Sequence, residues 1–283
     1  MEAFLGTGLL GSGFVRAKLR KGKEVHVWNR TEEKAKALEA AGAKAFTKPE
    51  DAAKGAVRIH LALSDDKAVD EILERASSGF APNTILIDHT TTSAQGAEKR
   101  TQTWKERGFS YVHAPVFMGP QNALESTGYM MVSGDEKTVK LLEPELSQMT
   151  GKLVYLGPKA DRAAGIKLLG NLFLISLATG IADTLALAKA LGIPASEVSS
   201  LFDWFNPGAM APARLKRILK AEFDEPSWEL KMARKDTRLM LEEALRGDMS
   251  LIAIPSIARE MDRWIEKGMG NKDWTIIAKD AVT

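Results

Sequence analysis

Lys167 and Asn171 are the two side chains whose types and spacing could do acid–base chemistry. They stand four residues apart in a long apolar run from Asp161 to Leu191, so on a helix their side chains share one face. A partly buried lysine beside a polar amide can act as a general acid, because burial lowers the lysine pKa toward the working pH. The alternative is a solvated lysine at the rim of a buried helix, with Asn171 packed against its neighbour. These two residues alone do not decide between the two interpretations.

A glycine pattern near the start of the chain has the spacing G-x-G-x-x-G. Gly6, Gly8 and Gly11 follow a short apolar segment and precede a predicted helix, with Leu9 and Leu10 between the last two glycines. In such a turn the first glycine makes the bend, the second lets the backbone approach a pyrophosphate, and the third lets the helix pack on the strand. The helix N-terminus offers amide donors to the phosphates. The pattern predicts a dinucleotide site.

The end of the second predicted strand indicates which dinucleotide binds. A chain that binds NAD usually carries an acidic residue about 20 residues after the glycines, and this carboxylate would repel a 2′-phosphate. Here the position holds Asn29, and Arg30, Thr31 and Lys34 follow it. These side chains could bind a 2′-phosphate, so the sequence favours NADP over NAD. The alternative is that Arg30 is an ordinary surface arginine in a loop.

The elements that must position these residues change in kind near Pro158. Before it, strands alternate with helices, which predicts a doubly wound, largely parallel sheet of the Rossmann type with ligands at the carboxyl ends of its strands. After it, only helices are predicted, so we expect an α/β domain over 1–159 and an all-α domain over 160–283. The strands are expected at 3–5, 24–28, 44–46, 57–63, 84–88, 110–116, 129–133 and 153–156.

Three carboxyl ends in the predicted sheet carry candidate ligand-binding residues. The first presents Leu63 and Ser64, which we expect near the cofactor. The second presents the hydroxyl cluster Thr90–Ser93, in which Ser93 could be the N-cap of the next helix but the threonines lack that explanation. The third presents Phe117, Met118 and Gly119.

The apolar run predicts one long helix between the domains, capped by Asp161 and ended at Gly192. Its apolar residues cover all faces, which predicts a buried core helix. Its uncharged stretch from Leu168 to Ala182 has 15 residues, fewer than the ~20 that span a bilayer. We therefore expect no membrane span.

Composition excludes several classes of function. The net charge of +2, from 39 basic and 37 acidic residues, gives no electrostatic reason to expect nucleic acid or an anionic membrane surface as partner. The chain has no cysteine, and its histidines form no i, i+4 pair, so we expect no metal site. The start, MEAFLGTG, shows no secretory signal, so a cytoplasmic location is expected. The histidines are His26, His60, His89 and His113.

These motifs, in this order, resemble the beta-hydroxyacid dehydrogenases of the 6-phosphogluconate dehydrogenase-like superfamily. This group contains 3-hydroxyisobutyrate dehydrogenase and the glyoxylate and succinic semialdehyde reductases, and the likeness covers nearly the whole chain. It implies that Thr90 and Thr91, after Asp88, bind the substrate, and that Lys167 is the catalytic lysine with Asn171 as its asparagine.

The resemblance has further implications for cofactor and assembly. The Asn29-Arg30-Thr31 stretch looks like that of the NADP-preferring members. Lys235 is expected to approach the cofactor and Asp236 the active site, both from the helical domain. The resemblance also implies a homodimer or homotetramer.

The chain departs from the family at the loop after Pro115. The family usually reads Asp-Ala-Pro-Val-Ser-Gly-Gly there, whereas this chain has His113-Ala-Pro-Val-Phe-Met-Gly119. Phe117 and Met118 add apolar bulk and remove a donor for a substrate carboxylate, although Gly119 could still offer its amide. The same fold also resembles the imine reductases, which usually carry Asp or Tyr at the position of Lys167.

We therefore expect an NADP(H)-dependent oxidoreductase that acts on a small carbonyl compound or hydroxy acid in the cleft between its domains. Lys167 would protonate the developing alkoxide. The first alternative is an imine reductase, or a reductase of uncharged carbonyls, on the same fold. The second is a non-catalytic NADP-binding module that presents a surface to a protein partner.

Overall fold

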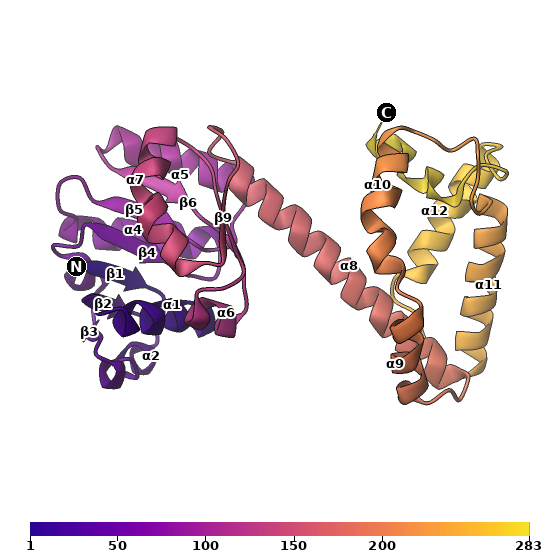
Figure 1. Ribbon diagram of the computed structural model, residues 1–283, viewed down its shortest axis with the longest axis horizontal. Coiled ribbons are helices and arrows are strands. Elements are labelled where there is room, and N and C mark those ends of the chain that lie inside the picture. The colour runs from indigo at the N-terminus through magenta and orange to yellow at the C-terminus, as the bar shows by residue number, and fades with distance from the viewer. Residues whose placement is uncertain (283) are drawn as a thin grey trace. The chain divides into compact units, whose positions relative to one another are not determined.

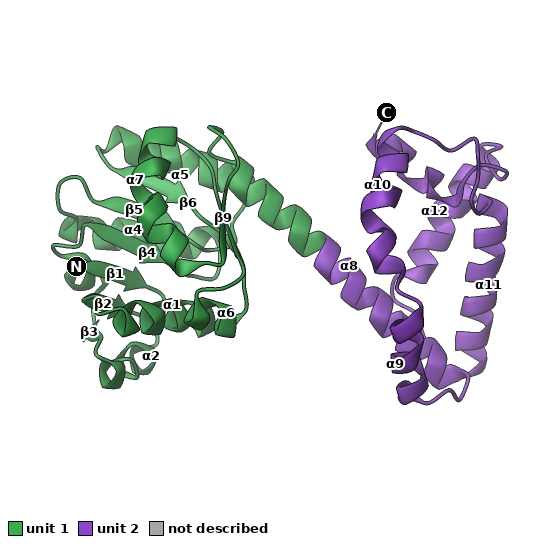
Figure 2. Cartoon of the chain, viewed as in Figure 1, with its two compact units in different colours: residues 1–172 green, residues 173–283 purple. Residues whose placement is uncertain are grey.

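The computed structural model describes residues 1–282, which form two compact units (Figure 2). The first unit is Met1–Leu172 and the second begins at Phe173. The boundary lies inside helix α8 (Arg162–Ala190), beyond the expected boundary at residue 159. The reason is that the first turns of α8 pack on the first unit, where Ala163 and Ala164 are fully buried.

A parallel sheet of six strands forms the first unit, in the order β3-β2-β1-β4-β5-β6 (Figure 1). This is the doubly wound order of the Rossmann fold, in which the sequence of strands reverses beside the first strand. The strands are β1 (Glu2–Leu5), β2 (Val25–Trp28), β3 (Lys44–Phe46), β4 (Arg58–Leu61), β5 (Ile85–Asp88) and β6 (Ser110–His113).

Helices cover both faces of this sheet because its strands are apolar on both sides. Along β1, Phe4 faces one hydrophobic core and Ala3 and Leu5 face the other, as the two-residue period of a strand requires. Residues of α1, α6 and α7 join the first core, and residues of α3, α4 and α5 join the second. These helices are α1 (Leu9–Arg20), α3 (Pro49–Ala53), α4 (Asp66–Ala76), α5 (Ala94–Glu106), α6 (Pro120–Glu125) and α7 (Glu136–Leu146), and the short α2 (Glu32–Lys36) follows β2.

A second sheet of three strands corrects one prediction. The expected single strand over 110–116 is wrong. β6 ends at His113, Ala114 and Pro115 lie outside any strand, and Val116–Phe117 forms the separate strand β7. Proline lacks the N–H that a ladder needs and restricts the residue before it. β7 pairs antiparallel with β8 (Tyr129–Val132), which pairs parallel with β9 (Lys152–Tyr155).

The second unit is helical, as predicted. Its core contains Phe223, Leu230, Met261, Trp264 and Ile276. Its elements after α8 are α9 (Ala195–Trp204), α10 (Ala211–Leu219), α11 (Leu230–Arg246), α12 (Ile254–Glu266) and two 3₁₀ segments, Pro207–Met210 and Trp274–Ala281.

The prediction that α8 is buried is wrong for the chain by itself. Leu169, Leu172 and Ile175 are 63%, 64% and 66% exposed, because the elements described within each unit leave its part of the helix uncovered. An 18-residue stretch of α8 with a mean hydropathy of 1.6 also has the length and composition of a membrane span. From the sequence, the run is judged too short to span a bilayer because only the uncharged residues from Leu168 to Ala182 are counted.

Candidate functional site

The glycine turn after β1 leaves open space only at its middle glycine. A Cβ at Gly6, where φ is +104°, would lie 2.4 Å from the carbonyl oxygen of Ala62, and a Cβ at Gly11 would lie 2.1 Å from that of Gly6. A Cβ at Gly8 would have no described atom within 4 Å. Gly6 and Gly11 therefore shape the turn, whereas Gly8 keeps a backbone surface open.

The start of α1 is suited to an anion. Gly8 is its N-cap and no side chain accepts a hydrogen bond there, so the first amides of the helix remain available to a phosphate. Leu9, at the first turn, is 79% exposed, whereas Leu10 packs against the core. The local geometry thus fits the phosphates of a dinucleotide.

Asn29 links the glycine turn to the end of β2. Its Oδ1 accepts a hydrogen bond from the backbone N–H of Thr7 at 3.0 Å, and its Nδ2 donates to the carbonyl oxygen of Thr31 at 2.9 Å. Both functional groups of Asn29 are therefore used to hold the turn. Arg30 and Lys34 are exposed, and among residues 1–282 neither forms an ion pair, so their charges are available to a ligand.

The loops after β4 and β5 are joined by the hydroxyl of Thr90. Its Oγ1 accepts a hydrogen bond from the backbone N–H of Leu63 at 2.9 Å, and Thr90 is only 2% exposed. The structure therefore brings an expected substrate residue and an expected cofactor residue together. Thr91 and Ser64 are exposed, which makes the Thr91 hydroxyl the more accessible of the two threonine hydroxyls.

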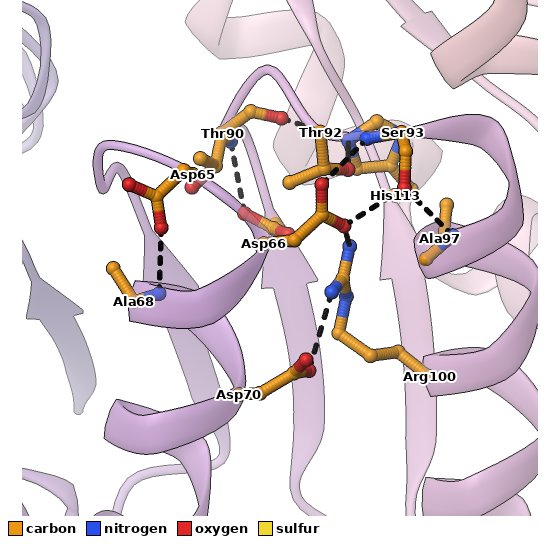
Figure 3. A network of polar contacts seen from close by, with 12 residues as sticks. Asp65, Asp66, Ala68, Asp70, Thr90, Thr92, Ser93, Ala97, Arg100 and His113 are labelled. Carbon is orange, nitrogen blue, oxygen red and sulfur yellow. Dashed lines mark hydrogen bonds and ion pairs between the residues drawn. The ribbon is translucent and has the colours of Figure 1, made fainter.

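Carboxylates hold the backbone of the Thr90–Ser93 loop from below (Figure 3). The backbone N–H of Thr90 donates to Asp88 Oδ1 and that of Ser93 donates to Asp66 Oδ2, each at 2.9 Å. The Ser93 hydroxyl accepts from the N–H of Gly96 at 3.0 Å, so Ser93 is the N-cap of α5 as expected. The loop is thus fixed at both ends.

A buried arginine connects these carboxylates, and nothing in the sequence pattern indicates it. Arg100 of α5 is 3% exposed and donates to Asp66 Oδ1 at 2.6 Å, to Asp70 Oδ1 at 3.2 Å and to the Tyr111 hydroxyl at 3.0 Å. The Tyr111 hydroxyl donates to Asp88 Oδ2 at 2.6 Å. Burial and the charge of Asp88 raise the pKa of Tyr111 well above its usual value, so this hydroxyl stays a donor.

Lys167 lies on the first turns of α8, within the first unit, and is partly buried. Burial lowers its pKa below the usual value for lysine. The ammonium nitrogen lies 4.5 Å from the centroid of the Phe117 ring, and no acidic side chain in the part of the chain that is described pairs with it. Asn171, one turn later, is also partly buried. A lysine in such surroundings can lose and regain a proton readily.

The loop after β7 differs from expectation at Gly119. Its backbone N–H donates to Asn122 Oδ1 at 2.9 Å, where α6 begins. That amide is therefore already used and is not free for a substrate carboxylate, as the sequence had left open. Met118 is partly buried and packs against the core of the first unit.

Lys235 and Asp236 lie on α11 in the second unit. The Lys235 nitrogen is 2.5 Å from Asp236 Oδ1, and both side chains are partly exposed. Their expected approach to the cofactor and the substrate stays a prediction.

The buried histidines form hydrogen bonds. His89 Nδ1 lies 2.8 Å from the carbonyl oxygen of Ala114, and His60 Nδ1 lies 3.0 Å from His89 Nε2. Burial lowers the pKa of His89 to about 3. His113 Nε2 lies 2.8 Å from the carbonyl oxygen of Thr90. These contacts fix the strand ends that carry the loops.

One group of side chains near His60 has the composition of a metal site. Ligand atoms of Glu2, His60 and Glu145 lie within 4.8 Å of one another. The Lys18 nitrogen lies 2.5 Å from Glu2 Oε2 and 2.8 Å from Glu145 Oε1. The ammonium thus already supplies the positive charge that this pair of carboxylates requires.

Comparison with known proteins identifies the first unit. Residues 2–157, more than half of the 283-residue chain, match the family described as the NAD binding domain of 6-phosphogluconate dehydrogenase. An uncharacterized oxidoreductase of Bacillus subtilis (strain 168), YfjR, is 26% identical over 287 residues, which cover 98% of this chain and 98% of the relative. An NAD-dependent L-serine dehydrogenase of Pseudomonas aeruginosa is 26% identical, with 98% and 96% covered.

A solved structure shares the fold. The imine reductase from Myxococcus stipitatus in complex with NADP+ superposes with a TM-score of 0.91 at 18% identity, and 99% of each chain is covered. At this identity the likeness concerns the fold alone. It confirms the predicted class, a Rossmann sheet followed by a helical region with a long helix.

The open space at Gly8 leads to a test that separates cofactor binding from folding. Gly8→Ala places a methyl group where the phosphates of NAD(P)H approach the backbone. We expect at least a tenfold rise in the Kd for NAD(P)H, measured by fluorescence titration, with the melting temperature nearly unchanged. Gly165→Ala, at a glycine of α8 whose Cβ would also meet no described atom within 4 Å, is the control. Unchanged affinity in Gly8→Ala would place the phosphates elsewhere.

Proposed function

Because the chain belongs to the family of the NAD binding domain of 6-phosphogluconate dehydrogenase, we propose that it is an NADP(H)-dependent oxidoreductase. In the proposed reaction, a small carbonyl compound is reduced to its alcohol, or the alcohol is oxidised back. The substrate pair can be an aldehyde acid and its hydroxy acid. One observation carries the proposal: Lys167 is partly buried, has a lowered pKa, and has no carboxylate partner within the described chain. The names of the B. subtilis and P. aeruginosa relatives, an oxidoreductase and a dehydrogenase, are consistent with it.

Lys167, Asn171 and Thr91 have different roles in this reaction. A bound reduced nicotinamide supplies a hydride to the carbonyl carbon. Lys167 donates a proton from Nζ to the carbonyl oxygen, so that hydride and proton together give the alcohol, and neutral Lys167 takes the proton back in the oxidising direction. Asn171, on the same face of α8, orients the lysine or the oxygen. The exposed hydroxyl of Thr91 binds the polar end of the substrate.

Imine reduction is the second candidate function. The apolar Phe117 ring beside Lys167 is consistent with it. An imine substrate is less polar than a hydroxy acid and needs no carboxylate anchor. The third candidate, a non-catalytic NADP-binding module, leaves unexplained why a lysine is held half-buried without a counter-charge. Turnover of any carbonyl or imine by the wild-type protein would exclude that third candidate.

The role of Lys167 predicts the kinetics of its variants. Lys167→Ala should lower kcat for carbonyl reduction by roughly 10²- to 10⁴-fold, the usual worth of a general acid, without loss of NADPH affinity. In the wild type the protonated lysine is the donor, so kcat should fall as the pH rises through its lowered pKa. Lys189→Ala, at an exposed lysine on the same helix, is the matched control. An unchanged rate in Lys167→Ala would remove the lysine from the mechanism.

The exposed charges after β2 predict the choice of cofactor. Arg30→Ala should raise the Kd for NADPH by about 10- to 100-fold, since a hydrogen bond to a charged group is worth about 1.5–3 kcal/mol, and should leave the Kd for NADH unchanged. Lys36→Ala, on α2 and paired with Glu32, is the control. Equal losses for both dinucleotides would show that Arg30 does not bind the 2′-phosphate.

The uncovered apolar surface of α8 supports the proposal of a homodimer or homotetramer. Soluble chains rarely leave such a continuous apolar surface in water. A mostly apolar groove of about 710 Å³ runs beside the second half of α8 and is lined by Ile175, Leu187, Met240 and Ile257 among others. Sedimentation should give two or four times the chain mass of 30.9 kDa. A monomer at working concentration, or a chain found only with membranes, would refute this assembly.

A further inference from the structure

Phe117 is seated in a notch on α8 that exists only because residue 170 is glycine. A Cβ at Gly170 would lie 2.2 Å from Phe117 Cζ and 2.6 Å from Cε1, far closer than two carbon atoms approach. Phe117 itself is fixed at the end of β7, where it pairs with Tyr129 of β8. The ring and the helix backbone therefore fit each other, and glycine in the middle of a helix, which costs about 1 kcal/mol relative to alanine, has a packing reason.

The same ring covers one side of the Lys167 ammonium. The nitrogen lies 4.5 Å from the ring centroid, within the range of a cation–π contact. Lys167 and Gly170 are three residues apart, so the two contacts of the ring lie on one face of the helix. An aromatic face thus lies beside the proposed general acid.

This arrangement disfavours a charged group on the substrate. A carboxylate next to the ring would lose water without gaining a donor, because the nearby Gly119 amide already donates to Asn122. If the carboxylate paired with Lys167 instead, its negative charge would stabilise the protonated ammonium and make it a weaker proton donor to the carbonyl oxygen. An uncharged, apolar substituent would pack on the ring without either cost.

Resting on the proposed function, we infer that Phe117, seated on Gly170, is a specificity-determining residue that directs the site to aldehydes and ketones without a carboxylate. Phe117 selects the substrate because its apolar ring lies beside Lys167. Gly170 affects specificity only because it sets the position of that ring.

The test compares two aldehydes of similar length, pentanal and succinic semialdehyde, with NADPH. For the wild type we expect a higher kcat/KM with pentanal. Phe117→Ser should lower the kcat/KM for pentanal relative to that for succinic semialdehyde by roughly tenfold or more, because the variant turns over the acid better. Phe117→Leu keeps apolar bulk and should keep most of the preference.

Gly170→Ala tests the seating of the ring, with Gly165→Ala as the matched control. A Cβ at Gly165, on the same helix, meets no described atom within 4 Å. We expect Gly170→Ala to lower the melting temperature and to disturb the substrate ratio, and Gly165→Ala to do neither. Added to Phe117→Ser, which lacks the ring, Gly170→Ala should lower the melting temperature much less than it does in the wild type.

Two results would overturn the inference: a wild type that prefers succinic semialdehyde, or a substrate ratio that Phe117→Ser leaves unchanged. An equal loss of melting temperature from Gly170→Ala in the wild type and in Phe117→Ser would refute the seating on Gly170. The proposed function fails in a different way, if the wild type oxidises NADPH with neither aldehyde. The melting temperatures then still decide the seating, and the specificity claim falls with the function.

Discussion

Close backbone packing at Gly6 and Gly11 is the constraint on which the geometry of the first unit depends. The Gly6 backbone lies against the carbonyl of Ala62 and the Gly11 backbone against the carbonyl of Gly6, at separations that admit no side chain. This packing brings the N-terminus of α1 to the carboxyl edge of the sheet. Asn29 then ties the turn to the end of β2 through the Thr7 amide. Dinucleotide binding follows from these contacts, since they present free amides beside an open surface at Gly8.

Hydrogen bonds between loops extend this fixed geometry along the sheet edge. Thr90 joins the loop after β5 to the loop after β4. Arg100 donates directly to Asp66 and is linked to Asp88 through the Tyr111 hydroxyl, and these two carboxylates accept from the loop amides. Breaking one partner of such a buried charged network leaves the other unpaired, which is costly. These hydrogen bonds hold the backbone of the loop after β5. Lys167, on the first turns of α8, belongs to the same unit, so the proposed proton donor and the loop residues lie in one compact body.

The sequence predicts the fold well because the fold depends on local patterns. Alternating strands and helices predict the doubly wound order, and glycine spacing predicts the turn. The break at Pro115 could have been predicted, since proline cannot donate to a ladder. Contacts between distant residues could not: Arg100 with Asp66, Gly119 with Asn122, and Phe117 with Gly170 depend on tertiary packing. Gly170 did carry a signal, because an isolated glycine inside a helix often has a packing role. The prediction that α8 is buried was wrong because the sequence pattern shows which faces of a helix are apolar but not which elements or chains cover them.

The central claim is that this chain transfers a hydride between NADP(H) and a carbonyl carbon, with Lys167 as proton donor. The most direct test is the transfer of deuterium from C4-deuterated NADPH to product, followed by mass spectrometry, with pentanal, succinic semialdehyde, glyoxylate and a cyclic imine as acceptors. The account predicts one deuterium on the former carbonyl carbon of an aldehyde, and loss of most of this product in Lys167→Ala. Transfer to the imine alone, or to none of the four acceptors while NADPH still binds, would contradict it.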